Sequence, residues 1–333
     1  MVAKTEQMTK KERVRAALSG GEVDRVPASL WGHDFLREWT PEDLVESTLD
    51  AWRPYDWDFI KFNPRATYFA EAWGNTYERP KDQRQPKLLG TAVASSADLR
   101  SLRAVNATAG VLGEHIDALK MLVDRVGNEV DVIHTLFSPL SVLAQLCGAP
   151  KDFIQMARSA PSDVHAALDA MAQALAAYGE ASIAAGAAGI FFAPLIWASR
   201  DTADEEFYRT FGRPYDLRVI EAAAGAPFNV LHVCRNNNML EQLLDYPVAA
   251  FNWADHGEGN PSLAAIRAKT EKAVMGGLDQ ARLHAMTADE VVAQGRQAVA
   301  GGTTRVLLTA GCAINPETPA ANRAAVMAAA RGR

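Results

Sequence analysis

The residues best suited to chemistry are one histidine and two cysteines that end short apolar runs. His232 and Cys234 lie two positions apart, and Cys312 follows a later run of the same kind. Neutral imidazole and thiolate are the ligands that a borderline-soft ion such as Zn²⁺ prefers. Residues i and i+2 of a strand point to the same face, so we expect His232 and Cys234 to project together. With Cys312 arriving from a second strand, the pattern predicts a three-ligand metal site.

The His-x-Cys pattern alone has a plainer interpretation, a buried histidine that is hydrogen-bonded in the core beside a packed cysteine. A structural zinc site usually has four protein ligands close together in sequence, whereas these three candidates lie far apart. Their spacing therefore favours an open catalytic site. Asp255, Asp279 or an incoming substrate would occupy the fourth position.

The elements that must position these residues are eight short apolar runs separated by helical segments. The runs are 26–31, 58–62, 130–137, 189–193, 228–234, 249–253, 273–278 and 305–308. Strands that alternate with helices predict a parallel sheet with right-handed crossovers. Eight such units predict one α/β domain over 1–333, a (β/α)₈ TIM barrel with an N-terminal helix. Residues 66–105 form an insertion or lid-like segment after the second strand. A doubly wound open sheet is the alternative, but its Gly-x-Gly-x-x-Gly turn occurs nowhere in the chain.

Polar residues follow these runs at the end where a barrel carries its active site. As candidate acids or bases we name His33, Asp34 and Asp255. As candidate substrate-binding residues we name Asn63, Ser138, Trp197, Arg235, Asn252 and Asp279. Simpler roles are open for several of them: Asp279 as a helix cap, Trp197 as barrel packing and Arg235 as a surface residue.

The composition is that of a globular protein, with 48% apolar and 22% charged residues. A net charge of −6 without a basic stripe argues against nucleic acid as a partner. Three cysteines do not make a disulfide framework, and Cys147 has the surroundings of a small buried hydrophobic residue. The sequence shows neither an apolar membrane-spanning run nor a signal peptide, so we expect a cytoplasmic protein without a membrane partner.

Several short motifs resemble those of the uroporphyrinogen decarboxylase superfamily, a set of (β/α)₈ barrels that includes corrinoid-dependent methyltransferases. The motifs run nearly from end to end: Lys11-Glu12-Arg13, Asp24-Arg25-Val26-Pro27, Phe137-Ser138-Pro139-Leu140, Gly276-Gly277-Leu278-Asp279 and Gly311-Cys312-Ala313-Ile314. The decarboxylases carry an arginine-bearing motif after the first strand that binds porphyrin carboxylates. This chain has Leu30-Trp31-Gly32-His33-Asp34-Phe35 there. The resemblance therefore favours the methyltransferase branch.

The methyltransferase branch uses His-x-Cys and a distant Cys to hold zinc, and this pattern maps onto His232, Cys234 and Cys312. The resemblance implies a zinc-dependent methyltransferase that moves a methyl group between a corrinoid and a small thiol, with a metal-bound thiolate as the nucleophile. The chain lacks an Asp-x-His-x-x-Gly corrinoid motif, so we expect methylcobalamin or a related corrinoid on a separate protein. Barrels of this kind often pair, which makes a homodimer a further expectation.

Two other functions are open to the sequence. One is a metal-free lyase of the decarboxylase type that acts on a smaller carboxylated substrate. The other is a ligand-binding barrel without catalytic activity. Zinc that is lost on replacing Cys234 or Cys312 would separate the first hypothesis from both alternatives.

Overall fold

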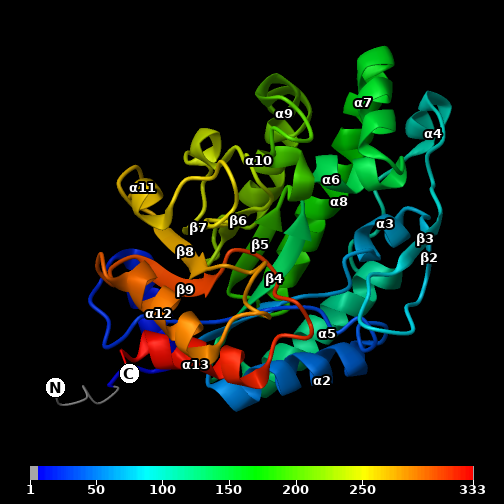
Figure 1. Ribbon diagram of the computed structural model, residues 1–333. Coiled ribbons are helices and arrows are strands. Elements are labelled where there is room, and N and C mark those ends of the chain that lie inside the picture. The colour runs from blue at the N-terminus through cyan, green and yellow to red at the C-terminus, as the bar shows by residue number, and fades with distance from the viewer. Residues whose placement is uncertain (1–6, 333) are drawn as a thin grey trace.

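The computed structural model describes residues 7–332, and its centre is a curved parallel sheet of seven strands (Figure 1). The strands are β1 (Phe59–Phe62), β4 (Asp131–Phe137), β5 (Gly189–Ala193), β6 (Val230–Val233), β7 (Ala250–Trp253), β8 (Ala273–Leu278) and β9 (Val306–Ala310). They lie side by side in this order, each parallel to the next. These seven strands confirm seven of the eight predicted runs.

The remaining run, residues 26–31, does not form a regular strand. Pro27 has no N–H group to donate to a ladder. The segment makes one isolated bridge, Ala28 with Leu308, and Gly32, directly after it, makes another with Ile314. Its backbone nevertheless joins the two edges of the sheet. Leu308 in β9 donates to Pro27 O at 2.9 Å, and Asp58, just before β1, donates to Ala28 O at 2.9 Å. The prediction of an eighth regular strand is therefore wrong. Residues 26–31 nevertheless lie between the two edge strands, β1 and β9.

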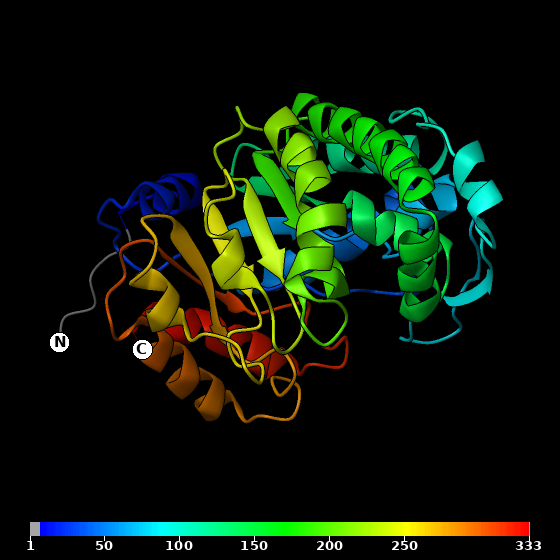
Figure 2. The same cartoon turned by 90° about the horizontal axis from the view of Figure 1, so that it is seen from above.

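Helices surround the outside of the sheet (Figure 2). The main ones are α1 (Lys10–Ser19), α2 (Pro41–Trp52), α5 (Gly110–Val126), α6 (Pro139–Leu146), α7 (Pro150–Ser159), α8 (Pro161–Ala184), α9 (Glu205–Phe211), α10 (Arg213–Ala222), α11 (Leu263–Arg267), α12 (Ala288–Val299) and α13 (Ala320–Ala330). Their starts follow sequence signals, such as the Thr9 capping box of α1 and the Thr40 cap before Pro41. Gly212 separates α9 from α10.

The segment 66–105 contains two short helices and a hairpin. They are α3 (Tyr68–Ala72), β2 (Thr76–Glu78), β3 (Lys87–Gly90) and α4 (Ser96–Ser101), and β2 pairs antiparallel with β3. Gln83, in the turn of this hairpin, donates to Asp34 Oδ1 at 2.9 Å and accepts from the Phe35 N–H at 3.1 Å. The hairpin therefore contacts the loop that follows the irregular segment 26–31.

Buried residues form two apolar layers. A large cluster lies between the sheet and its helices, and a smaller one fills the inside of the sheet with residues such as Phe59, Phe191 and Leu307. A fully buried carboxylate, Asp58, lies beside the small cluster. It accepts from Arg13 at 2.7 Å and from Arg25 at 2.6 Å. Within residues 7–332, no helix has the length and apolar character needed to cross a membrane.

Candidate active site

A cavity of about 900 Å³ opens at the carboxyl ends of the strands. Its lining includes residues from β1, β4, β5 and β6 and from the loops at the carboxyl end of the sheet, among them the loop after β9. Among them are Trp31, His33, Lys61, Asn63, Phe191, Trp197, His232, Cys234, Arg235 and Cys312. The placement follows from the fold, because the carboxyl ends of parallel strands meet at one end of the sheet.

The structure brings His232, Cys234 and Cys312 together in this cavity. His232 lies in β6 and Cys234 directly after it, while Cys312 follows β9. Cys312 Sγ lies 3.5 Å from His232 Nε2, and the thiol of Cys234 interacts with Cys312. Zinc bonds of about 2.0 Å to nitrogen and about 2.3 Å to sulfur, at a tetrahedral angle, also separate these atoms by about 3.5 Å. The donor set therefore fits zinc in type and in this distance.

The positions of these three side chains do not form a complete metal coordination sphere. Within the described residues 7–332, no group of three or more His, Cys, Asp and Glu side chains is arranged as a ready metal site. Neither Asp255 nor Asp279 lines the cavity. A metal ion here would require small side-chain rotations and a fourth ligand from outside these three.

Asn252, in β7, fixes the orientation of the His232 ring. Its Nδ2 group donates to Met275 O at 2.9 Å and to Ala310 O at 3.2 Å. Because carbonyl oxygens only accept, this fixes the amide and turns Oδ1 toward His232 Nδ1, 2.6 Å away. The Nδ1 atom therefore carries the proton, and Nε2 presents its lone pair toward Cys312. A histidine ligand commonly has such an outer partner.

The two thiols titrate as a pair. The pKa of Cys312 is lowered well below its usual value, chiefly because the Cys234 thiol donates a hydrogen bond to the Cys312 sulfur. The pKa of Cys234 is raised by that same interaction and by burial. The two shifts run in opposite directions because both arise from the same interaction between the two sulfurs, so the thiols titrate as a coupled pair.

Lys61, in the middle of β1, is a cavity residue that the sequence analysis missed. It is buried, its Nζ donates to Asn63 Oδ1, and it lies 4.7 Å from the centroid of the Phe191 ring. Burial lowers the pKa of Lys61 to about 7, against the opposing charges of Cys312 and Glu38. The sequence could have indicated this placement. Lys61 is two positions before Asn63, which was a candidate site residue, and residues i and i+2 of a strand point to the same face.

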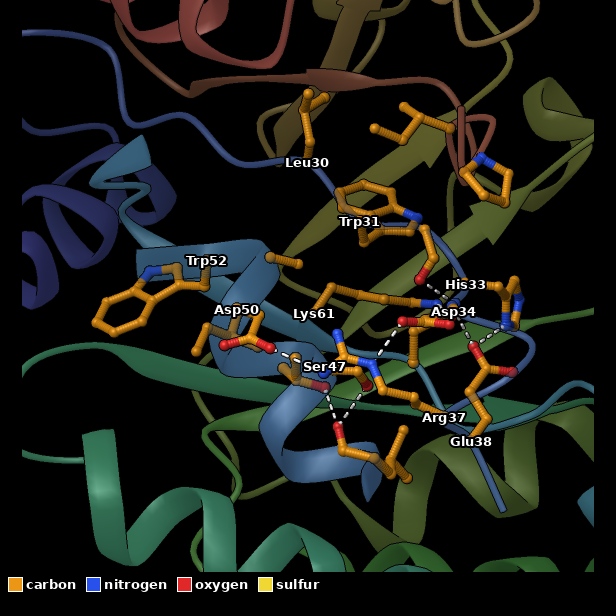
Figure 3. A pocket seen from close by; sticks show the side chains of 18 of the residues that line it. Leu30, Trp31, His33, Asp34, Arg37, Glu38, Ser47, Asp50, Trp52 and Lys61 are labelled. Atoms are coloured by element: carbon orange, nitrogen blue, oxygen red, sulfur yellow. Dashed lines mark hydrogen bonds and ion pairs between the residues drawn. The ribbon is translucent and has the colours of Figure 1, made fainter. Parts of the chain in front are cut away.

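His33 and Asp34 lie in the loop beside a smaller side pocket of about 250 Å³ (Figure 3). His33 lines both pockets, and its Nδ1 lies 2.7 Å from Glu38 Oε1. Asp34 lines only the side pocket, where Arg37 Nε donates to it at 2.8 Å. Burial alone would raise the pKa of Asp34, but hydrogen bonds from Gln83 and Arg37 outweigh it and lower the pKa. Asp34 is therefore an ion-paired carboxylate outside the main cavity.

The remaining candidates divide between the cavity and the protein around it. Trp197 and Arg235 line the cavity together with Asn63. Asp255 accepts from the Gly277 N–H at 3.0 Å, and burial raises its pKa to about 6. Asp279 accepts from the Ala281 N–H at 2.9 Å, in the turn after β8.

Ser138 is fully buried and does not line the cavity. It lies beside the carboxyl group of Asp216, which the tyrosines Tyr208 and Tyr246 also contact. Sequence position alone placed Ser138 at a strand end, and its side chain faces the helices behind the sheet.

Known proteins with similar sequences share nearly the whole chain. The methylcobamide:CoM methyltransferase MtbA of Methanosarcina mazei is 26% identical over 337 residues, 95% of this chain and 96% of that protein. The methylcobamide:CoM methyltransferase MtaA of Methanosarcina barkeri is 26% identical over 348 residues, 97% of this chain and 98% of that protein.

Solved structures share the fold. A methyltransferase from Methanosarcina mazei superposes with a TM-score of 0.82 at 24% identity, over 98% of this chain and 99% of its own. A B12-independent methionine synthase from Shewanella sp. W3-18-1 gives 0.60 at 16% identity, over 92% and 95%. Residues 9–333 match the family model described as uroporphyrinogen decarboxylase (URO-D). The chain belongs to the uroporphyrinogen decarboxylase family.

Proposed function

We propose that this protein is a methyltransferase that moves a methyl group between a corrinoid, carried on a separate protein, and a small thiol. The observation that carries the proposal is the meeting of His232, Cys234 and Cys312 in the cavity. The names of the relatives MtbA and MtaA, which match along nearly the full chain, support methyl transfer and a corrinoid partner.

We infer further that His232 Nε2 and the sulfurs of Cys234 and Cys312 would hold a zinc ion. Bound zinc lowers the pKa of a coordinated thiol, so that its thiolate is available at neutral pH. The residues of the chain prepare this site. Asn252 keeps the lone pair of His232 Nε2 toward the sulfurs, and the interaction with Cys234 lowers the pKa of Cys312. The protons that remain on the two thiols would leave when the metal binds.

The cavity supports a reaction between a small and a large partner. The three metal-ligand candidates and Lys61 lie inside it, while Arg235 lies at an exposed position of its lining. We infer that the acceptor enters the cavity and that the corrinoid protein docks over its mouth. We also propose that residues 27–29 complete a single (β/α)₈ barrel domain, with 66–105 as an insertion beside the mouth.

The decisive experiment combines metal analysis with a methyl-transfer assay. Wild-type protein is expected to carry about one zinc per chain and to demethylate methylcobalamin when a small thiol is added. Cys234→Ala and Cys312→Ala should lose both the zinc and the activity. Cys147→Ala is the matched control, because Cys147 is buried directly after α6 and its Sγ donates to Leu143 O.

Two outcomes would contradict the proposal. One is a folded wild-type protein, loaded with zinc, that transfers no methyl group to any small thiol. The other is release of carbon dioxide from a carboxylated substrate that survives both Cys234→Ala and Cys312→Ala, which would establish the lyase instead.

A further inference from the structure

We infer that His33 is the base of the cavity and takes the proton of the acceptor thiol, with Glu38 as its positioning residue. The inference rests on the proposed function in taking the proton donor to be the methyl acceptor. His33 was a candidate acid or base from its position in the sequence, whereas Glu38 was in none of the predicted site residues. Metal binding by His232, Cys234 and Cys312 uses neither of them.

The first argument is the hydrogen bond that fixes the His33 ring. Its Nδ1 atom lies 2.7 Å from Glu38 Oε1, and the same oxygen accepts from the Asp34 N–H at 2.9 Å (Figure 3). A carboxylate oxygen accepts, so Nδ1 carries the ring proton. The ring also stacks on Phe35, with the two centroids 4.9 Å apart. Among residues 7–332, Nε2 has no hydrogen-bond partner, so its lone pair is available to a ligand.

The second argument is the burial of Glu38. Its side chain is only 2% exposed, and its Oε2 atom is buried without a hydrogen-bond partner in the described part of the chain. The main chain at this position is also fixed, since Arg65 donates to Glu38 O at 3.3 Å. Burying a carboxylate with one oxygen unsatisfied is unfavourable for stability. Such a group is expected where its charge serves a reaction, here by stabilising an imidazolium on His33.

The third argument is the position of the ring relative to the proposed metal ligands. Gly32, directly before His33, pairs with Ile314, and the Ile314 N–H donates to Trp31 O at 2.9 Å. Cys312 lies two residues before Ile314, so the two segments reach the cavity side by side. His33 and Cys312 both line that cavity. An acceptor bound at the metal site would therefore share the cavity with the available Nε2 atom.

The proposed step is a proton transfer. The S–H bond of the acceptor breaks, its electron pair stays on the sulfur, and an N–H bond forms at His33 Nε2. The products are a thiolate and an imidazolium, so charge is balanced without a further reactant. The thiolate is the nucleophile of the methyl transfer, and Glu38 stabilises the positive charge of the ring.

The side pocket gives the proton a way out. His33 belongs to the wall that the main cavity shares with this pocket of about 250 Å³. The pocket reaches the surface, where the side chains of Arg37 and Asp50 are 40% and 58% exposed. A corrinoid protein over the mouth would close the main cavity to water. The imidazolium could still lose its proton to water in the side pocket.

Other charged groups lie near this wall and have to be separated from His33. Those of the side pocket are Lys61 from β1, Asp34, Arg37 and Glu38 from the loop of His33, Asp50 from α2 and Arg323 from α13. Arg37 pairs with both Asp34 and Asp50, and the main cavity adds Asp201 and Arg235. Lys61 lines both cavities, and burial lowers its pKa to about 7. Lys61→Met is therefore part of the test.

The first measurement follows the proton when a thiol binds, in the absence of any corrinoid. Zinc-loaded protein is titrated with 2-mercaptoethanol by calorimetry at pH 7, in two buffers that differ in their enthalpy of ionisation. Wild-type protein should release clearly less than one proton per bound thiol, because His33 keeps it, whereas His33→Gln should release about one. Lys61→Met should behave as the wild type does. So should His284→Gln, which replaces an exposed histidine outside the cavity.

The second measurement is the pH profile of methyl transfer from methylcobalamin to the same thiol. An alkyl thiol of pKa about 8.5 or above is at most about 3% ionised at pH 7. Without a base in the cavity, the protein would use this ionised fraction alone. His33→Gln should therefore lower kcat/KM by about 30-fold or more at pH 7 and by only a few-fold at pH 9.5, where the thiolate is abundant.

Two variants of Glu38 test its positioning role. Glu38→Gln keeps an oxygen that the Asp34 N–H holds in place, so the amide can still accept from His33 Nδ1. Glu38→Ala removes that oxygen. In ¹⁵N NMR spectra of the imidazole, the Nδ1–H tautomer of His33 should dominate in the wild type and in Glu38→Gln, and both tautomers should appear in Glu38→Ala. Activity at pH 7 should fall in the same order.

The inference is overturned if folded His33→Gln releases no more protons than the wild type on thiol binding, since another group then keeps the proton. It is also overturned if the kinetic defect of His33→Gln is the same at pH 7 and pH 9.5, which would mean a structural role. A wild-type protein that binds no thiol would overturn it together with the proposed function. If His33 retains the proton but no methyl group is transferred, the base stands and only the proposed function fails.

Discussion

Replacing Asn252 by leucine tests how the protein prepares His232 for a metal ion. Leucine has the same number and branching of side-chain heavy atoms as asparagine but cannot accept a hydrogen bond from His232 Nδ1. The ring then loses the partner that fixes its tautomer and its orientation. Removal of such an outer partner lowers metal affinity by about 10- to 100-fold, which corresponds to roughly 1.4–2.7 kcal/mol.

The same change also affects folding. Asn252 is fully buried, and its amide donates to Met275 O and Ala310 O, which connects β7 with β8 and β9. Leucine leaves these two carbonyl groups without that donor. A buried polar group without its partner costs about 1–3 kcal/mol. We therefore expect Asn252→Leu to be less stable than the wild type by an amount in this range, yet still folded.

The two effects are measured separately. Zinc affinity is determined by competition with a chromophoric chelator, and the free energy of unfolding by urea titration of the metal-free protein. Thr309→Val is the matched control, because Thr309 contacts Asn252 Nδ2 at 3.4 Å but does not touch His232. It should lose little zinc affinity. If folded Asn252→Leu binds zinc as tightly as the wild type, or if Thr309→Val weakens zinc binding equally, the tautomer argument is wrong.

Three further predictions concern stability. Burial lowers the pKa of His134 to about 3 from an unfolded value of about 6.5, so its stabilising effect is complete above pH 6.5 and is lost as the pH falls toward 3. The wild-type free energy of unfolding should therefore be about 2 kcal/mol lower at pH 5 than at pH 8 because of this group. Urea titrations at the two pH values should show a smaller difference between them for His134→Gln than for the wild type. Asp58→Ala removes the carboxylate shared by two buried guanidinium groups and should lower the free energy of unfolding by about 3–5 kcal/mol, whereas a loss within 1 kcal/mol would contradict the role of this cluster. Gly189→Ala would place a Cβ atom 2.2 Å from Phe228 O, so we expect a lower melting temperature by calorimetry, and an unchanged one would show that β5 and β6 can separate freely.

The sequence predicted the seven regular strands because each is an apolar run bounded by turn residues. It also predicted that His232, Cys234 and Cys312 would meet, since all three lie at carboxyl ends of parallel strands. The run 26–31 was apolar like the others, but Pro27 and the irregular neighbouring backbone limit it to isolated bridges. An apolar pattern alone does not distinguish a regular strand from an extended segment that makes only isolated bridges.

The supporting residues of the site were harder to predict. The orientation of the Asn252 amide depends on carbonyl groups of β8 and β9, which become its neighbours only after folding. Lys61 lies in an otherwise apolar strand, and whether it is paired or free to bind a ligand depends on residues from other loops. Such roles arise from contacts between distant segments, and no local pattern encodes them.

The hydrogen bonds between residues 27–29 and β9 have a consequence for synthesis on the ribosome. Residues 27–29 are translated long before their partner Leu308 in β9. The early strands must therefore wait, with one sheet edge unpaired, until β9 has left the exit tunnel. Cys312 emerges at the same late stage, so a nascent chain cannot assemble the complete cavity before the sheet edges are joined. We expect chaperones to cover the inner apolar surface, including Phe59, during this interval.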